Sequence, residues 1–279
     1  MPMIKIKDIN LYYELHGEGD PLVLLSGTGS SGEHFRVFQL PDLAKHFRVL
    51  IWDYRGTGRS DKPDMPYSTR MLAEDCVDLM KALEIERAHM LGFSMGGRIA
   101  QWIAIEQPEC VASLLLLSTG PGTVSGFTFE RGLPLKLCLS MIENGFEKHV
   151  RDFYTSEFLF PPEFVRKNTE VVNSIRDANL KYPTPLKPYL LHTIARQEHD
   201  TSHLLHKIEC PTLIVCGSDD KYITGTLPHI HSSKALADGI KGSKFVLVED
   251  CRHGFLWQKP EKANQIFIDF FRHHPITKN

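Results

Sequence analysis

Short runs of apolar residues alternate along much of this chain with segments that have helical spacing. Continuous apolar runs of four to six residues are typical of strands that are covered on both faces. We expect such strands at residues 22–25, 47–52, 88–91, 114–117, 211–216 and 244–249, and two further strands, joined by a polar turn, at residues 4–7 and 11–15. Strands that alternate with helices form mostly parallel sheets. The pattern therefore predicts an α/β fold with a mostly parallel sheet of about eight strands and helices on both faces.

Helical spacing appears in four places between these runs. A short helical segment is expected around residues 35–38 and should stop near Pro41, because proline disrupts a helix interior. Ser68 is a suitable N-cap for a longer helix with an apolar inner stripe. A third helix should follow Ser94, and an amphipathic helix should close the chain at residues 260–271.

The alternation of strand and helix stops near Gly122 and resumes near residue 209. The residues between carry helical patterns broken by prolines, and phenylalanines crowd the first half. We therefore predict an α/β core made of residues 1–121 and 209–279. Residues 122–208 are predicted to form a helical cap that lies over the sheet.

Composition narrows the class of protein. The 279 residues suit one large α/β domain with an insertion, and the net charge of −2 gives no indication of a nucleic acid or an anionic membrane as partner. The N-terminus lacks an apolar signal core, and no stretch is long enough to span a bilayer. Six scattered cysteines without a Cys-x-x-Cys pair are typical of reduced thiols. We expect a cytoplasmic protein with a small-molecule substrate; a homodimer remains open.

A glycine-rich turn between a predicted strand and a predicted helix carries the first candidate for chemistry. Gly92, Ser94 and Gly96 satisfy the pattern Gly-x-Ser-x-Gly. In a nucleophile elbow of this kind, the serine occupies a strained backbone conformation and the small neighbours allow a tight turn. The serine hydroxyl would then lie at a helix N-terminus, where amide groups favour developing negative charge.

A serine nucleophile needs a base, and the base needs an acid that fixes its tautomer. The strand at residues 211–216 is followed by Gly217-Ser218-Asp219-Asp220, and the strand at 244–249 by Asp250-Cys251-Arg252-His253. Ligands bind at the carboxyl ends of parallel strands, where these loops should meet. Ser94, an aspartate near residue 220 and His253 therefore follow the chain order serine, acid, histidine of such hydrolases.

These motifs together resemble those of α/β-hydrolase fold proteins over nearly the whole chain. Gly217-Ser218-Asp219-Asp220 matches the family's Gly-x-x-Asp, and the resemblance implies that Asp220 is the catalytic acid. The Asp53–Ser60 loop is similar to the family's Asp-x-Arg-Gly-x-Gly-x-Ser and is expected to be structural. The resemblance also implies an oxyanion hole made by the backbone N–H groups of Thr28 and Met95. Ser26 departs from the family pattern, in which histidine is usual.

The resemblance implies a serine hydrolase with a Ser94–His253–Asp220 triad that cleaves a small or medium carboxylic ester or lactone. Candidate substrate contacts are His34, expected at a polar rim, Phe93 and Trp257. The alternative is a carbon–carbon bond hydrolase of the ring-fission-product type. Those relatives usually carry asparagine where this chain has Phe93, which favours ester chemistry. A non-catalytic ligand receptor on the same fold is the alternative from another class.

Two other patterns in the sequence are typical of different functions. Gly27-x-Gly29-x-x-Gly32 with Asp53 has the form of a dinucleotide fingerprint, but Pro41 should cut the following helix short. His192, His199, His203 and His206 could share a helix face as metal ligands, although polar or surface roles are more typical. We therefore expect no cofactor and no metal.

Overall fold

A single eight-stranded sheet organises the molecule. The computed structural model describes residues 2–125, 132–220 and 228–276. The strand order is β1-β2-β4-β3-β5-β6-β7-β8. The strands are β1 (Met3–Ile6), β2 (Ile9–His16), β3 (Pro21–Leu25), β4 (Arg48–Trp52), β5 (Ala88–Phe93), β6 (Val111–Leu117), β7 (Thr212–Gly217) and β8 (Lys244–Val248). The predicted α/β fold is confirmed, and each of the eight expected strands occurs with its ends shifted by at most three residues.

The helices include three short 3-10 helices, named η. They are η1 (Gly32–Phe35), α1 (Gln39–Leu43), α2 (Thr69–Ala82), α3 (Met95–Glu106), η2 (Pro108–Cys110), α4 (Leu135–Asn144), α5 (Phe146–Phe153), α6 (Pro162–Lys167), α7 (Thr169–Leu180), α8 (Leu186–Gln197), η3 (Ser202–Lys207), α9 (His229–Gly239), α10 (Phe255–Gln258) and α11 (Pro260–Arg272). Ser68 caps α2 as expected: its hydroxyl accepts the Met71 N–H at 3.0 Å.

Helices cover both faces of the sheet, and each face has its own apolar core. On one face, α2, α3 and α9 bury residues such as Leu72, Ile99 and Leu236 against the strands. On the other face, α11 buries Phe267 and Phe271. Burial on both faces explains why the central strands are continuously apolar rather than alternating.

The strand directions bring the candidate loops to one edge. Strand β2 pairs antiparallel with both β1 and β4. The other strand pairs, β4–β3, β3–β5, β5–β6, β6–β7 and β7–β8, are parallel. The carboxyl ends of β3, β5, β7 and β8 therefore point the same way. The loops that follow these strands carry Thr28, Ser94, Asp220 and His253, and they lie along this edge.

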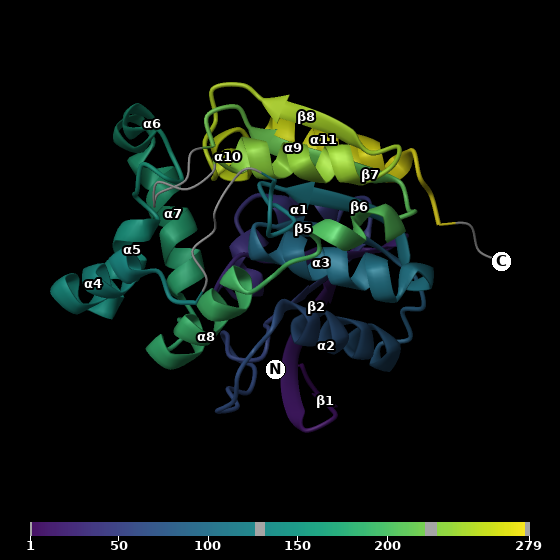
Figure 1. Ribbon diagram of the computed structural model, residues 1–279, viewed down its shortest axis with the longest axis horizontal. Helices are drawn as coiled ribbons and strands as arrows, with labels where there is room; N and C mark the ends of the chain where they lie inside the picture. Colours follow the sequence, from purple (N-terminus) through teal and green to yellow (C-terminus); the bar gives the residue numbers. More distant parts are fainter. Residues whose placement is uncertain (1, 126–131, 221–227, 277–279) are drawn as a thin grey trace.

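In the described part of the chain between β6 and β7, the α-helices α4 to α8 project to one side of the sheet (Figure 1). The described residues between β6 and β7 contain no strand. Part of the expected cap, residues 126–131, lies outside the described residues. The division into a core of residues 1–121 and 209–279 and a cap of residues 122–208 stays a prediction.

The expectation for Pro41 was wrong. Residues 32–35 form a 3-10 turn, and Pro41 lies inside α1 rather than ending a helix. A proline within the first turn of a helix removes only an N–H that has no partner inside the helix, so α1 tolerates it.

The Asp53 loop has the structural role that was expected. The Asp53 carboxylate accepts the Gly32 N–H at 2.8 Å and the Arg59 N–H at 2.8 Å, and it also accepts the Arg59 Nε–H at 2.7 Å. Asp53 is buried. The carboxylate thus ties the loop after β4 to η1, and the bond to the Gly32 N–H gives Asp53 and Gly32 of the fingerprint-like pattern a structural role.

None of the described helices is long and apolar enough to cross a membrane.

One of the histidines considered as metal ligands instead joins α8 to the core. His192 is fully buried, and its Nε2 lies 2.8 Å from the Arg55 carbonyl oxygen. The ring stacks on Tyr54 at a centroid distance of 6.1 Å. His199 is also buried and bonds to Thr69 Oγ1 at 2.9 Å. Both histidines therefore connect the chain between β6 and β7 to the rest of the fold. His192 contacts the loop after β4, and His199 contacts the start of α2.

Burial lowers the pKa of His192 to about 4, against the smaller opposing effect of the Arg55 carbonyl. An unfolded histidine takes up its proton near pH 6.5, so the unfolded state gains stability first as the pH falls. The free energy of unfolding should therefore fall between about pH 6.5 and pH 4. The free energy of unfolding can be measured by urea unfolding at pH 7.5 and at pH 5.0. Its decrease between these two pH values should be smaller in His192→Gln than in the wild type, by about 1–2 kcal/mol. An equal pH dependence in both proteins would contradict this.

Candidate active site

Ser94 lies at the sharp turn between β5 and α3. Its backbone has φ 55° and ψ −117°, a region that non-glycine residues rarely occupy and that costs about 1–3 kcal/mol. The Ser94 N–H donates to the Leu117 carbonyl at 2.9 Å, and the Thr119 hydroxyl donates to the Ser94 carbonyl at 2.7 Å. Both bonds come from the end of β6, so the neighbouring strand holds the strained turn in place.

The two glycines of the Gly-x-Ser-x-Gly pattern are required by close packing. A Cβ on Gly96 would lie 2.0 Å from the Leu25 carbonyl oxygen, and a Cβ on Gly92 would lie 2.6 Å from the Gly96 carbonyl oxygen. These neighbours are backbone atoms that cannot rotate away. The start of α3 can therefore approach β3 and β5 closely only because both positions lack a side chain.

The acid comes from the loop after β7. Asp220 is 1% exposed, and its carboxylate oxygens lie 3.0 and 3.2 Å from His253 Nδ1. Asp219, by contrast, is turned toward Arg252, whose Nε lies 3.3 Å from Asp219 Oδ2. The structure thus places Asp220 rather than Asp219 beside the candidate base.

His253 lies in the loop after β8. It is held by Asp220 and by residues of the chain between β6 and β7. Its backbone N–H donates to the Phe158 carbonyl at 3.3 Å, and the next amide, of Gly254, donates to Leu159 at 2.9 Å. The His253 ring stacks on Phe158 with centroids 4.4 Å apart. A bond from Nδ1 to Asp220 leaves Nε2 available as an acceptor, the tautomer that a general base requires.

A second histidine, His229, reaches the same carboxylate. His229 Nδ1 lies 3.3 Å from Asp220 Oδ1, and the His229 and His253 rings are 4.5 Å apart. Burial would raise the pKa of Asp220, but His253 and His229 outweigh it and hold this pKa well below its usual range. Burial lowers the pKa of His229 despite the nearby carboxylate. Asp220 is therefore a stable anion shared by two rings.

The ligand atoms of Asp220, His229 and His253 all lie within 4.8 Å of one another. Two imidazoles and one carboxylate are suitable donors for a divalent transition metal. The same contacts are also what a general base and its orienting acid require, so the cluster does not call for a metal.

The loop after β3 lies beside the serine. A Cβ on Gly27 would contact the Phe93 ring at 3.5 Å and the Ser94 Cβ at 3.7 Å. The Ser26 hydroxyl donates to the Ser30 carbonyl at 2.9 Å, so the residue that replaces the family's histidine closes the loop on itself. Met95 is the first residue of α3, and its N–H therefore has no partner inside the helix. The amides of Thr28 and Met95 stay the predicted oxyanion donors.

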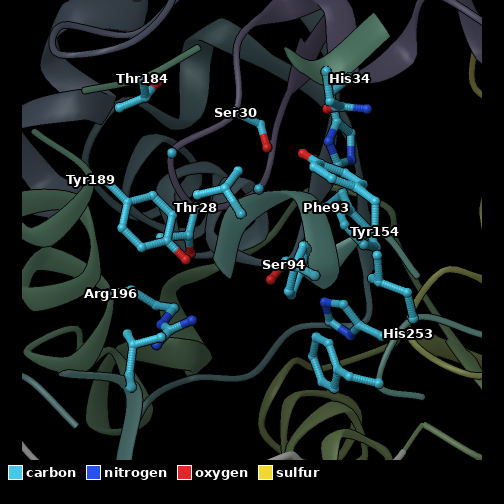
Figure 2. Close-up of a pocket in the computed structure, with 18 of the residues that line it drawn as sticks. Thr28, Ser30, His34, Phe93, Ser94, Tyr154, Thr184, Tyr189, Arg196 and His253 are labelled. Carbon is cyan, nitrogen blue, oxygen red and sulfur yellow. The ribbon is translucent and has the colours of Figure 1, made fainter. Parts of the chain in front are cut away.

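A cavity of about 260 Å³ opens above Ser94. Thr28, Ser94 and His253 line it together with residues of α5, α7 and α8. In Figure 2, Tyr189 and Arg196 lie on one side of Ser94, and His34, Phe93 and Tyr154 lie on the other. The serine hydroxyl thus faces a space with a polar, cationic side and an aromatic side.

His34 lines this cavity. The prediction that it lies at a polar rim was wrong, because its side chain is buried. It is 3% exposed and lies between Phe93 and Trp257, at ring distances of 5.0 and 4.5 Å. Burial lowers the pKa of His34 to about 3, although the Asn179 carboxamide raises it in part. Neither ring nitrogen has a hydrogen-bond partner among the described residues. A neutral imidazole is therefore available to a bound molecule.

Phe93 and Trp257 also reach the cavity. The Phe93 ring packs 4.9 Å from the His253 ring and 5.8 Å from Trp257. The Trp257 indole N–H donates to the His34 carbonyl at 3.3 Å. Phe93 therefore supports the candidate base, and both aromatic residues form part of the cavity wall.

The sequence did not single out His229, Tyr154, Tyr189 or Arg196. His229 follows the acid by nine residues at the start of α9, and residues 221–227, which separate them, lie outside the described residues. Tyr189 and Arg196 lie on α8, and Tyr154 directly follows α5; helical spacing in this part of the chain indicates burial but not which face meets the cavity.

Comparison with known proteins identifies the family. Residues 20–260 match the sequence model of the alpha/beta hydrolase fold family, so the chain belongs to that family. It is 30% identical to the “Putative carbamate hydrolase RutD” of Azorhizobium caulinodans, with 97% of this chain and 98% of that protein covered. It is 28% identical to the 2-hydroxy-6-oxo-6-phenylhexa-2,4-dienoate hydrolase of Comamonas testosteroni, with 96% and 93% covered.

A solved structure described as Est816, an N-acyl homoserine lactone degrading enzyme, is also similar. It is 26% identical, has a TM-score of 0.79, and the match covers 97% of this chain and 100% of that one. These similarities support a hydrolase, and they span relatives that act on different bonds.

The packing of the elbow makes a prediction about stability. Gly96→Ala should push α3 away from β3, because the new Cβ would meet the Leu25 carbonyl, and it should lower the free energy of unfolding by about 3 kcal/mol. Thermal unfolding measures this. Gly27→Ala is the matched control, since its Cβ would make only ordinary contacts of 3.5 Å or more. Equal melting temperatures for the two variants would contradict the close approach.

Proposed function

We propose that this protein is a serine hydrolase that cleaves a small or medium carboxylic ester or lactone through an acyl-enzyme on Ser94. The observation that carries the proposal is the strained Ser94 turn beside a buried Asp220–His253 pair, with Ser94 and His253 facing one cavity. The cavity volume of about 260 Å³ suits a small ligand, and aromatic rings on one side suit an apolar part of it.

In the first half of the reaction, Ser94 Oγ attacks the carbonyl carbon while His253 Nε2 takes the hydroxyl proton. Asp220 keeps the Nδ1 proton in place and stabilises the imidazolium that forms. The Thr28 and Met95 amides donate to the oxyanion of the tetrahedral intermediate. Collapse of the intermediate breaks the bond to the alcohol oxygen, which receives the proton from His253.

In the second half, a water molecule loses a proton to His253 and attacks the acyl carbon. The resulting intermediate releases Ser94, which takes the proton back, and the carboxylic acid leaves. A lactone would follow the same course, with the alcohol and the acid remaining on one product molecule. No step requires a cofactor.

The carbon–carbon bond hydrolase remains the second candidate, because the Comamonas testosteroni relative acts on a ring-fission product by its name. The residue before the serine, Phe93, favours ester chemistry: its ring packs against His253 and offers no hydrogen bond to a substrate enol or ketone. A cytoplasmic location, a small-molecule partner and a homodimer stay predictions.

The nucleophile can be tested directly. Ser94→Ala should fold normally and lose roughly a thousandfold or more of kcat, because the residual rate would come from binding and oxyanion donors alone. Labelling by a fluorophosphonate should disappear in the same variant. Wild-type turnover by Ser94→Ala would rule out the mechanism. A labelled wild type that binds ligands and turns over nothing would support the receptor alternative.

The bond that is cleaved can be tested with a matched pair of substrates. The wild type should hydrolyse simple aryl esters with a kcat/KM at least tenfold above that for a vinylogous 1,5-diketone. An aryl carbamate in the same panel tests for carbamate hydrolysis, the activity in the name of the Azorhizobium caulinodans relative. The reverse preference, for the diketone, would assign the protein to carbon–carbon bond cleavage instead.

A further inference from the structure

The charged side chains that line the cavity are of one sign among the residues that the structure describes. Among the described residues that line the cavity, the cationic side chains are Arg98, Lys136 and Arg196, and there is no aspartate or glutamate. The catalytic acid itself lies behind His253 and does not line the cavity. A cavity with cationic walls and apolar surfaces favours a ligand of negative charge.

Arg196 is the best placed of the three. It lies in the last turn of α8, and its Nε is buried without a hydrogen-bond partner in the described part of the chain. No ion pair of Arg196 occurs among the described residues. Glu198, two residues further on, is exposed and accepts the Gly132 N–H. A partly buried guanidinium without a carboxylate partner is costly unless a ligand supplies one.

The helix that carries Arg196 is fixed over the candidate oxyanion loop. A Cβ on Gly29 would lie 2.6 Å from the Tyr189 ring, so Tyr189 packs directly on the residue after Thr28. Arg196 follows Tyr189 by seven residues, about two helical turns, and therefore lies on the same face of α8. Figure 2 shows both side chains on the same side of Ser94, and both line the cavity.

Arg98 positions this end of α8. It lies one turn after Ser94 on α3, and its Nη1 donates to the Arg196 carbonyl oxygen. The bond joins the helix that begins at the nucleophile to the helix that carries the free guanidinium. The position of Arg196 relative to Ser94 is therefore fixed by direct contact between α3 and α8, not by an exposed loop.

We propose that the substrate carries a carboxylate, which the Arg196 guanidinium binds while Ser94 attacks the ester or lactone carbonyl. The inference rests on the proposed function and adds the substrate class: an ester or lactone of an acid with a second, anionic end. A guanidinium suits this role because it can donate two parallel hydrogen bonds to one carboxylate. The aromatic side of the cavity would then receive the uncharged end.

Matched substrates test the proposal. Mono-4-nitrophenyl adipate has an acyl chain that ends in a carboxylate, and its terminal amide is a neutral substrate of the same shape. A second pair places the charge on the alcohol: 3-acetoxybenzoate and 3-acetoxybenzamide. In the wild type, kcat/KM should favour the anionic member of at least one pair by about tenfold or more.

Arg196→Gln should remove this preference, so that within the variant kcat/KM for the anionic member falls to about that for its neutral partner. Arg196→Lys should retain part of it. The control is Arg166→Gln on α6, an exposed arginine that does not line the cavity and should behave as the wild type. Hydrolysis of both neutral esters with no anionic preference, or a preference that survives Arg196→Gln, would overturn the inference and leave the proposed function intact. Absence of both hydrolysis and fluorophosphonate labelling would instead overturn the proposed function, and this inference with it.

Discussion

The architecture of the site depends on the close approach of the α3 N-terminus to the sheet. Gly96 lies against the Leu25 carbonyl, and this contact allows the chain to turn from β5 into α3 within one residue, Ser94. The strained backbone of that residue is held by two hydrogen bonds: its N–H donates to the Leu117 carbonyl at the end of β6, and its carbonyl accepts from the Thr119 hydroxyl just beyond. The sheet thus keeps the serine hydroxyl raised at the edge where the other loops meet.

The remaining parts of the site are supported by the helices between β6 and β7. Backbone carbonyls of Phe158 and Leu159 accept the amides of His253 and Gly254, and the Phe158 ring covers the His253 imidazole. On the opposite side, His192 and Arg98 bind α8 to the loop after β4 and to α3. The candidate base and the walls of the cavity are therefore held by the same segment, so changes in these helices can alter specificity while the elbow stays in place.

The sequence predicts the sheet and the elbow well because both depend on local patterns. Apolar runs of strand length and the Gly92-Ser94-Gly96 spacing are sufficient to locate β5 and the turn. Long-range features were harder to predict. Pro41 was expected to end a helix because its position in the first turn of α1 could not be known, and His34 was expected at a rim because burial by Phe93 and Trp257 depends on tertiary packing. His229 and Arg196 became visible only when α9 and α8 were placed beside the loops.

The most direct test of the central claim is the crystal structure of the protein after reaction with a fluorophosphonate. Attack by Ser94 should leave phosphorus bonded to its Oγ, with the phosphoryl oxygen in place of the oxyanion of an ester intermediate. The account predicts that this oxygen accepts hydrogen bonds from the Thr28 and Met95 amides and that His253 Nε2 lies within hydrogen-bonding reach of Oγ. An adduct on another residue, or a phosphoryl oxygen turned away from both amides, would contradict it.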